Sequence, residues 1–268
     1  MPSSAVLSRQ KAHAGAGRRK LPWHLAGTLG ILALLLGLWW LVSAEKWVEP
    51  IVLPSPSEVR EALSEMVAQG SFWTHVWVTA KEVAIGFTLS CAAAVAAATL
   101  CIRYDRLRGV VYPYAFAIQS FPKILLVPLF GVLFTYGMGL TIVLVVAGAF
   151  FPTFINTLRG YESAQPEGVT LMRTMGAPPR QVLRMYLLPS ALPLMFIGLR
   201  ASMSAAFLLV VIGEFAGAQH GVGYLINAEA YALRTSYVYG GIVAVSVLAG
   251  VFYATIVVAD HLLVARRR

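Results

Sequence analysis

The sequence predicts an all-α polytopic membrane protein with six transmembrane helices and one structured cytoplasmic loop. Apolar residues make up 58% of the 268 residues, charged residues only 12%, and the mean hydropathy is +0.72. A soluble domain of this length needs far more charged surface. Several nearly uncharged runs approach the ~20 residues that a helix needs to cross the hydrocarbon of a bilayer. Lys and Arg gather at every second boundary of these runs.

The first predicted span, residues 25–44, is the uncharged run "LAGTLGILALLLGLWWLVSA". A basic tail, residues 1–24, precedes it and is expected in the cytoplasm. Small residues at positions 42–44 leave a cleaved signal peptide as an alternative, which would leave five spans. The apolar run is longer than the usual core of a signal peptide, so we expect the span to stay.

A short surface helix is predicted between the first two spans, on the external side. Ser57 follows two prolines and suits a helix N-cap, and apolar residues recur from Val59 to Val67 at helical spacing. Trp73 and Trp77 are expected at the membrane interface, where amphipathic rings prefer to lie.

The remaining spans follow from the other apolar runs. Residues 83–102 form the second span. No charge occurs from residue 124 to residue 158, and "YGMG" at 136–139 divides this run, which predicts helices over roughly 110–134 and 140–158. Residues 193–216 and 235–259 complete a domain that covers residues 25–268, with its core at 70–262.

The orientation follows from the basic residues of the short loops. Both termini are predicted in the cytoplasm, because the basic residues lie before the first span, after the second, after the fourth and at the end of the chain: Arg9, Lys11, Arg18, Arg19, Lys20; Arg103, Arg106, Arg108; Arg159, Arg173, Arg180, Arg184; Arg266, Arg267 and Arg268. The intervening segment 45–65 instead holds five glutamates against one lysine and one arginine.

Several classes of function do not fit. The net charge of +9 comes from the ends of apolar runs rather than from a clustered basic face, so no nucleic acid partner is expected. The chain has no G-x-x-x-x-G-K-[ST] phosphate loop, no H-E-x-x-H pair and no G-x-S-x-G elbow. We therefore expect no enzymatic activity, no metal site and no cofactor on this chain.

A transporter driven by an ion gradient is the alternative from another class. Such transporters usually place carboxylates deep in the membrane. Here Glu82, Glu214 and Asp260 lie near the ends of predicted spans, and we see no inverted repeat. These observations weigh against the alternative.

Three charged residues inside predicted spans are candidates for a solute pathway: Lys123, Arg200 and Glu214. Lys123 follows Pro122 near the middle of the third span, where a charge is costly unless it faces a cavity or a partner. It lines a pathway or else extends along a break at Pro122. Arg200 lies one turn into the fifth span and suits an interface anchor better than a solute ligand.

The cytoplasmic loop, residues 159–192, is predicted to form two helices joined by a sharp turn. Pro166 suits the first turn of one helix, Gly176 its end, and Pro178 and Pro179 the start of the next, which Pro189 should stop. The expected apolar faces are Val169, Met172 and Met175 on the first helix and Val182, Met185 and Tyr186 on the second. The loop either lies flat on the membrane or docks a cytoplasmic partner.

The stretch "MRTMGAPPRQVLRMYLLPSALP" resembles the EAA loop of permease subunits of bacterial ATP-binding cassette (ABC) importers. Gly176 and Pro189 have the spacing of that loop, whereas Thr170, Leu171 and Met172 stand at its Glu-Ala-Ala positions, so a role for the missing glutamate is absent or falls to Glu167. The resemblance implies a coupling helix that contacts a separate ATPase subunit through these residues: Thr170, Arg173, Met175, Gly176, Ala177, Pro178 and Arg180.

Residues 50–262 resemble the nitrate, sulfonate and taurine class of these permeases through "VLPSPSEVREAL", "EVAIGF", "SFPKILLVPLFGVLF", "FFPTFINTLRG" and "GEFAGAQHGVGYLI". This resemblance implies a homodimeric permease in the bacterial inner membrane, ATP bound by the partner subunit, and an extracytoplasmic solute-binding protein. The implied solute is a small anion such as a sulfonate, taurine or nitrate. Riboflavin or a thiamine-pyrimidine precursor is the alternative within the same class.

The predicted topology can be tested with reporters that fluoresce only in the cytoplasm. Fusions at residues 105, 165 and 268 should be bright, and fusions at 60 and 225 should be dark, because the basic loops stay inside. A bright fusion at residue 60 would contradict six spans with both ends in the cytoplasm.

Overall fold

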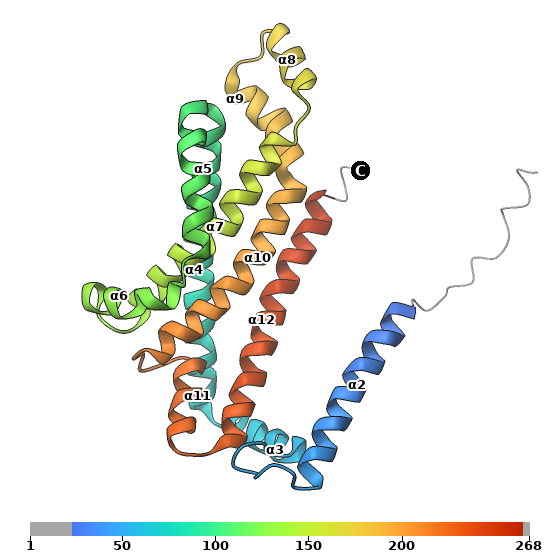
Figure 1. Ribbon diagram of the computed structural model, residues 1–268, viewed down its shortest axis with the longest axis vertical. Coiled ribbons are helices and arrows are strands. Elements are labelled where there is room, and N and C mark those ends of the chain that lie inside the picture. Colours follow the sequence, from blue (N-terminus) through green and yellow to red (C-terminus); the bar gives the residue numbers. More distant parts are fainter. Residues whose placement is uncertain (1–22, 265–268) are drawn as a thin grey trace, which may run out of the picture. The chain divides into compact units, whose positions relative to one another are not determined.

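Every regular element is a helix in residues 23–264, which is the part of the chain that this computed structural model describes (Figure 1). Four helices are long and apolar enough to cross a membrane: Gly70–Arg103, Met138–Glu162, Pro179–Phe215 and Thr235–Val264. Two shorter apolar segments, Gly30–Ala44 and Lys123–Phe134, lie within the first and third predicted spans. The chain is an all-α polytopic membrane protein. Most of the basic tail and the three terminal arginines lie outside the described residues.

The residues up to Pro56 form one unit and those from Ser57 form another. The first unit contains α2 (Trp23–Ala44), whose apolar side chains, such as Leu34 and Trp40, are largely exposed. A helix that is apolar on all sides suits lipid rather than water. The indole nitrogen of Trp39 donates to the carbonyl of Pro54 at 3.0 Å, so the chain after α2 folds back onto that helix.

Three long helices form the centre of the second unit: α4 (Gly70–Arg103), α7 (Met138–Glu162) and α10 (Leu188–Phe215). Glycines let their backbones approach closely. A Cβ atom at Gly198 would lie 2.9 Å from the carbonyl oxygen of Pro152, and one at Gly160 would lie 2.8 Å from that of Ala191. Helices in lipid associate through such close packing because burial of apolar surface drives them little. The buried core along them includes Val83, Leu140, Leu144, Val145, Ala149, Phe207 and Val210.

Ser202 of α10 repairs a break in α7. Pro152 lies inside α7, where its ring opposes the regular hydrogen-bond ladder. The hydroxyl of Ser202 accepts from the backbone N–H of Thr153 at 3.1 Å and donates to the carbonyl of Ala149 at 2.6 Å. These two groups are the i and i−4 partners of an ordinary α-helix, so the hydroxyl bridges the opened turn. Backbone groups in hydrocarbon need such partners.

The third predicted span, roughly 110–134, is not one helix. The chain forms α5 (Asp105–Ser120), a 3₁₀ turn η1 (Lys123–Leu125) and α6 (Leu126–Phe134). Phe121, which precedes Pro122, is extended with φ −68° and ψ 130°. The proline disfavours helical geometry at the residue before it, so α5 ends there. The nine residues of α6 rise only about 13.5 Å, which is too short to cross a bilayer alone.

The second span begins earlier than predicted. Helix α4 starts at Gly70 rather than at residue 83, so residues 70–82 are helical and Glu82 lies inside the helix. The predicted surface helix is present as α3 (Pro56–Ala68). It starts at Pro56, one residue before the predicted cap Ser57, because proline suits the first position of a helix.

The loop after α7 forms the predicted pair of helices, α8 (Pro166–Thr174) and α9 (Pro179–Val182), but Pro189 does not stop the second one. The segment η2 (Leu183–Leu187) is a π-helix that joins α9 to α10 without interruption. A π turn widens the helix and so accommodates the missing N–H and the ring of a proline. Residues 179–215 are therefore one helical path.

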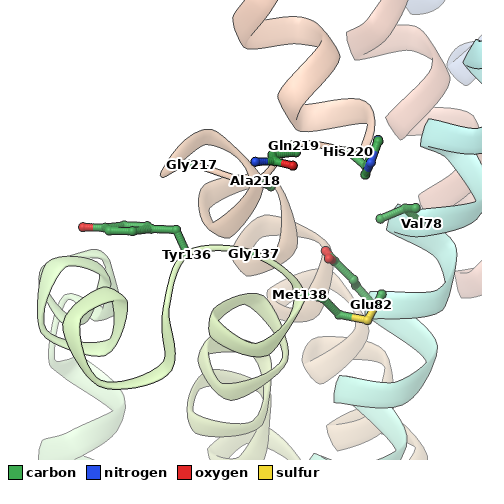
Figure 2. Close-up of a pocket in the computed structure, with 9 residues that line it drawn as sticks. All are labelled: Val78, Glu82, Tyr136, Gly137, Met138, Gly217, Ala218, Gln219 and His220. Carbon is green, nitrogen blue, oxygen red and sulfur yellow. The ribbon is translucent and has the colours of Figure 1, made fainter.

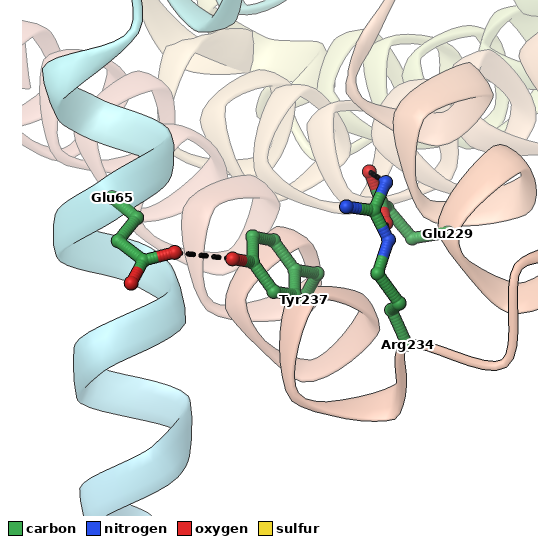
Figure 3. A network of polar contacts seen from close by, with 4 residues as sticks. All are labelled: Glu65, Glu229, Arg234 and Tyr237. Atoms are coloured by element: carbon green, nitrogen blue, oxygen red, sulfur yellow. Dashed lines mark hydrogen bonds and ion pairs between the residues drawn. The ribbon is translucent and has the colours of Figure 1, made fainter.

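The end of the second unit opposite α8 and α9 holds α11 (Val222–Tyr231) and the start of α12 (Thr235–Val264) (Figure 1). Polar contacts fasten this end (Figure 3). The hydroxyl of Tyr237 on α12 donates to Glu65 of α3, and Arg234 pairs with Glu229 of α11 at 2.6 Å. The guanidinium of Arg234 lies 5.0 Å from the centre of the Tyr237 ring.

Ser202→Ala should destabilise the protein by about 1–3 kcal/mol, because it leaves the N–H of Thr153 and the carbonyl of Ala149 without their bridging partner. The measurement is thermal unfolding of the purified protein in detergent. Ser204→Ala is the matched control, since the hydroxyl of Ser204 is exposed and bonds only to the carbonyl of Arg200 on its own helix. Equal stabilities of the two variants would contradict the bridging role.

Candidate functional site

The first candidate region is the elbow formed by residues 165–187, at the α8 and α9 end of the second unit. Tyr186 fixes α8 against the π-helical segment, because its hydroxyl donates to the carbonyl of Gln165 at 3.2 Å. Gly168 leaves room for the ring, since a Cβ atom there would lie 2.3 Å from the Tyr186 hydroxyl oxygen. The elbow is therefore held in one geometry by its own residues.

The turn of the elbow is a Schellman motif. Gly176 has a φ of +79°. Its N–H donates to the carbonyl of Arg173 at 2.9 Å, and the N–H of Ala177 donates to that of Met172 at 3.0 Å. This pair of bonds closes the carboxyl end of α8, and the left-handed residue between them favours glycine. The prediction that Gly176 ends the first helix is confirmed.

The tip of the elbow exposes apolar and basic side chains together. Leu171 is 62% exposed and Met175 is 78% exposed. The predicted apolar faces are each wrong at one position, because Met175 and Met185 point outward while Val169, Met172 and Val182 are at least partly covered. The π turn shifts the register at Met185. Of the residues assigned to ATPase coupling, Ala177 is half-buried and the rest are exposed: Thr170, Arg173, Met175, Gly176, Pro178 and Arg180.

Lys123 is tied to the end of α5. Its ammonium donates to the carbonyl of Gln119 at 2.8 Å, where the unpaired carbonyls of the last turn attract a cation. Its stem lies over Gly148 of α7, since a Cβ atom there would be 3.0 Å from the lysine Cδ. A hollow of 450 Å³ adjoins this point and is lined by Gln119, Ser120, Pro152, Ile155, Asn156, Arg159 and Ala201.

Arg200 is paired with Asp260 of α12. The pair joins α10 to α12, and both side chains are largely covered. A buried or half-buried ion pair in a bilayer favours a structural role, because either charge alone is costly there. The pair could not be found from the sequence, since its members are sixty residues apart and belong to different spans.

Glu214 holds the start of α11. Its carboxylate is buried and accepts from the hydroxyl of Thr79 at 2.6 Å and from the N–H of Gly223 at 2.6 Å. The hydroxyl of Thr79 in turn accepts from the N–H of Val222 at 2.8 Å. The first N–H groups of a helix have no partner within the helix. At the start of α11, a hydroxyl and a carboxylate accept hydrogen bonds from them. Lys123, Arg200 and Glu214 bind partners on different helices: Gln119 of α5, Asp260 of α12 and Thr79 of α4. The three residues therefore form no common site.

A second candidate region, not predicted from the sequence, is a pocket of 360 Å³ on this side of the second unit (Figure 2). Its lining combines α4 with the turn before α7 and the loop after α10, through Val78, Glu82, Tyr136, Gly137, Met138, Gly217, Ala218, Gln219 and His220. The apolar run that predicts this span begins at residue 83, so the sequence pattern leaves Glu82 at its boundary, whereas α4 begins at Gly70. The three-residue spacing of Thr79 and Glu82, which puts both on one helix face, was the available signal.

Comparisons with known proteins agree with this architecture. A solved structure described as "Crystal structure of an amino acid ABC transporter with histidines" aligns with a TM-score of 0.53 and 13% identity, over 76% of this chain and 97% of that one, which shows a shared fold. "Formylaminopyrimidine transport permease protein ThiX" of Halalkalibacterium halodurans is 30% identical over 88% of this chain and 94% of its own length.

Two further relatives carry names of the same kind. "Putative aliphatic sulfonates transport permease protein SsuC" of Bacillus subtilis is 27% identical over 92% of this chain and 91% of its own length. "Taurine transport system permease protein TauC" of Escherichia coli is 26% identical over 91% and 92%. Residues 86–268 match the family described as "Binding-protein-dependent transport system inner membrane component". The chain belongs to this family and is a permease subunit of an ABC importer.

Proposed function

We propose that this permease couples a separate cytoplasmic ATPase to the import of a small anion-bearing solute, such as a sulfonate or taurine, across the inner membrane of a bacterium. A second copy of the chain and an extracytoplasmic solute-binding protein complete the transporter. Both termini and the elbow then face the cytoplasm, and α11 faces outward. The observation that carries the proposal is the elbow, which is fixed internally and exposes its tip.

The elbow has the properties of a mechanical link. Tyr186 and the Schellman turn fix its shape, and the π-helical segment connects it to α10 without a flexible joint. Its exposed Leu171 and Met175 offer an apolar contact, and Arg173 and Arg180 are exposed on the same elbow. Interfaces combine an apolar centre with a polar rim in this way. A push on the tip would move α10 directly.

The solute class is supported by the relatives and by the charges on one hollow. The relatives named above are permeases for aliphatic sulfonates, taurine and formylaminopyrimidine. In this chain, Arg159 lines the 450 Å³ hollow, and Lys123 bonds to Gln119 on its wall. Cations beside a polar hollow lower the barrier for an anion and raise it for a cation.

A second copy of the chain has a suitable surface on the broken third span. The side chains of Leu129, Val132 and Leu133 on α6 are more than half exposed. Because α6 is too short to span the bilayer alone, burial against another subunit would shield its ends from lipid. This face therefore supports the proposal of a permease dimer.

Gly176→Val should uncouple the ATPase from transport. A β-branched residue is strained at a φ of +79°, so the Schellman turn would open while every span stays intact. We expect ATPase co-purification and solute uptake to fall together at normal membrane levels. Gly250→Val in α12 is the matched control, because a Cβ atom there meets nothing within 4 Å. Normal ATPase binding by the Gly176 variant would leave the elbow as a membrane-surface element only.

Lys123→Met should lower uptake of an anionic solute such as ethanesulfonate by about tenfold, which corresponds to about 1.4 kcal/mol. The methionine keeps the apolar stem and removes the charge beside the hollow. Uptake is measured in proteoliposomes that contain the ATPase and receive the binding protein. Lys123→Arg should restore transport, and Lys81→Met, an exposed lysine on α4, is the control. Full uptake by the methionine variant would remove Lys123 from the pathway.

A further inference from the structure

The pocket around Glu82 contains a carboxyl oxygen with no partner. Glu82 is 1% exposed, and its Oε2 atom accepts no hydrogen bond from any described residue. A buried polar atom without a partner destabilises the fold, because it has lost its hydrogen bonds to water and gained none in the protein. Native proteins tolerate such an atom mainly where a water molecule, an ion or a ligand supplies the missing contact. Glu82 also lines the pocket, and its carboxyl group faces the hollow in Figure 2.

The neighbouring groups leave the Oε2 atom without a partner. The Glu82 carboxyl makes hydrogen-bond contact with the hydroxyl of Thr141 and the carboxyl of Glu214, but Oε2 has no partner of its own. Glu214 in turn accepts from the hydroxyl of Thr79 and from the N–H of Gly223. The two adjacent carboxyl groups make the floor of the pocket at Glu82 electron-rich. The described residues that line the pocket include no lysine or arginine to balance it.

The rim of the pocket has a different character. Gln219 and His220 lie on the loop above Glu82 and offer an amide N–H₂ and an imidazole (Figure 2). These groups donate hydrogen bonds to an anionic oxygen, whereas the floor accepts them. The volume of 360 Å³ falls within the range of pockets for small ligands. The pocket therefore suits a small molecule with a donor at one end and an acceptor at the other.

We propose that this pocket is a solute site and that Glu82 binds an amino group of the solute, as in an aminosulfonate or an aminopyrimidine. The inference rests on the proposed import of a small solute and narrows its chemistry, because a plain sulfonate or nitrate has no group for Glu82. An ammonium would donate a hydrogen bond to the unpartnered Oε2 atom and balance one negative charge of the carboxyl pair. The sulfonate of an aminosulfonate would then lie near Gln219 and His220.

The first test measures binding without transport. Purified permease in detergent is heated in the presence of methylammonium, the smallest primary alkylammonium. The measured quantity is the melting temperature of the permease. Because a ligand stabilises the state that it binds, the melting temperature of the wild type should rise with methylammonium concentration. Glu82→Gln should abolish the rise, and Glu61→Gln, an exposed carboxylate on α3, should keep it.

Two results of this test would overturn the proposal. The absence of any rise in the wild type would mean that the pocket holds only water. An equal rise with sodium or potassium chloride at matched ionic strength would mean that it holds a simple cation rather than an amino group.

The second test separates this inference from the proposed function. Proteoliposomes with the ATPase and binding protein receive taurine or ethanesulfonate, which has no hydrogen-bond donor at the position of the amino group. Glu82→Gln should lower taurine uptake by about tenfold and leave ethanesulfonate uptake unchanged, since a lost charged hydrogen bond is worth about that factor. An equal fall for both solutes would make Glu82 structural and overturn the inference.

Two other outcomes are distinct. If the wild type carries neither sulfonate, the proposed anion import fails, and the methylammonium measurement still decides the pocket. Glu82→Gln could instead weaken attachment of the binding protein and leave the discrimination between the two solutes unchanged. Glu82 would then bind an amino group of the binding protein, such as a lysine, and the proposal of a solute site would be refuted.

Discussion

The structure depends on one requirement of the hydrocarbon phase, which is that every backbone N–H and carbonyl must find a partner inside the protein. Pro152 interrupts that pairing in the middle of α7, and the hydroxyl of Ser202 restores it by lying between Thr153 and Ala149. The repair comes from another helix, so α7 cannot complete its own ladder without α10. The glycine contacts at Gly160 and Gly198 bring the two backbones close enough for it. The two helices are consequently one structural unit rather than two neighbours.

This unit connects the two candidate regions. Helix α10 continues the elbow through η2 at one end and carries Glu214 at the other. Glu214 holds the start of α11, and the loop between them forms part of the Glu82 pocket. A displacement of the elbow would therefore reach the pocket through a single helical path, with Ser202 and Arg200 fastening it to α7 and α12 on the way. In the proposed transporter, this helical path would connect the ATPase contact to the solute pocket.

The sequence was sufficient for the features that depend on local chemistry. Uncharged runs predicted the apolar helices, and Pro166, Gly176 and Pro179 predicted both elbow helices and the turn, because each residue acts on its own backbone. The prediction that Pro189 ends a helix was wrong, because a π turn accommodates the proline. The prediction of one helix across Pro122 was also wrong, because the residue before this proline leaves helical geometry. Pairs such as Arg200 with Asp260, or Glu82 beside Glu214, depend on contacts between helices that are far apart in the sequence. A local sequence pattern does not predict which helices make contact.

The π-helical segment at Leu183–Leu187 has a consequence for the angular setting of the elbow. A π turn is equivalent to one extra residue in an α-helix, and one residue corresponds to about 100° of rotation about the helix axis. The direction in which Leu171 and Met175 face, relative to α10, is thus determined by a single surplus residue. A chain one residue shorter here would keep a regular α-helix and the same surface chemistry, yet would present that chemistry to a different side. Register, and not only composition, then decides which partner the tip can meet.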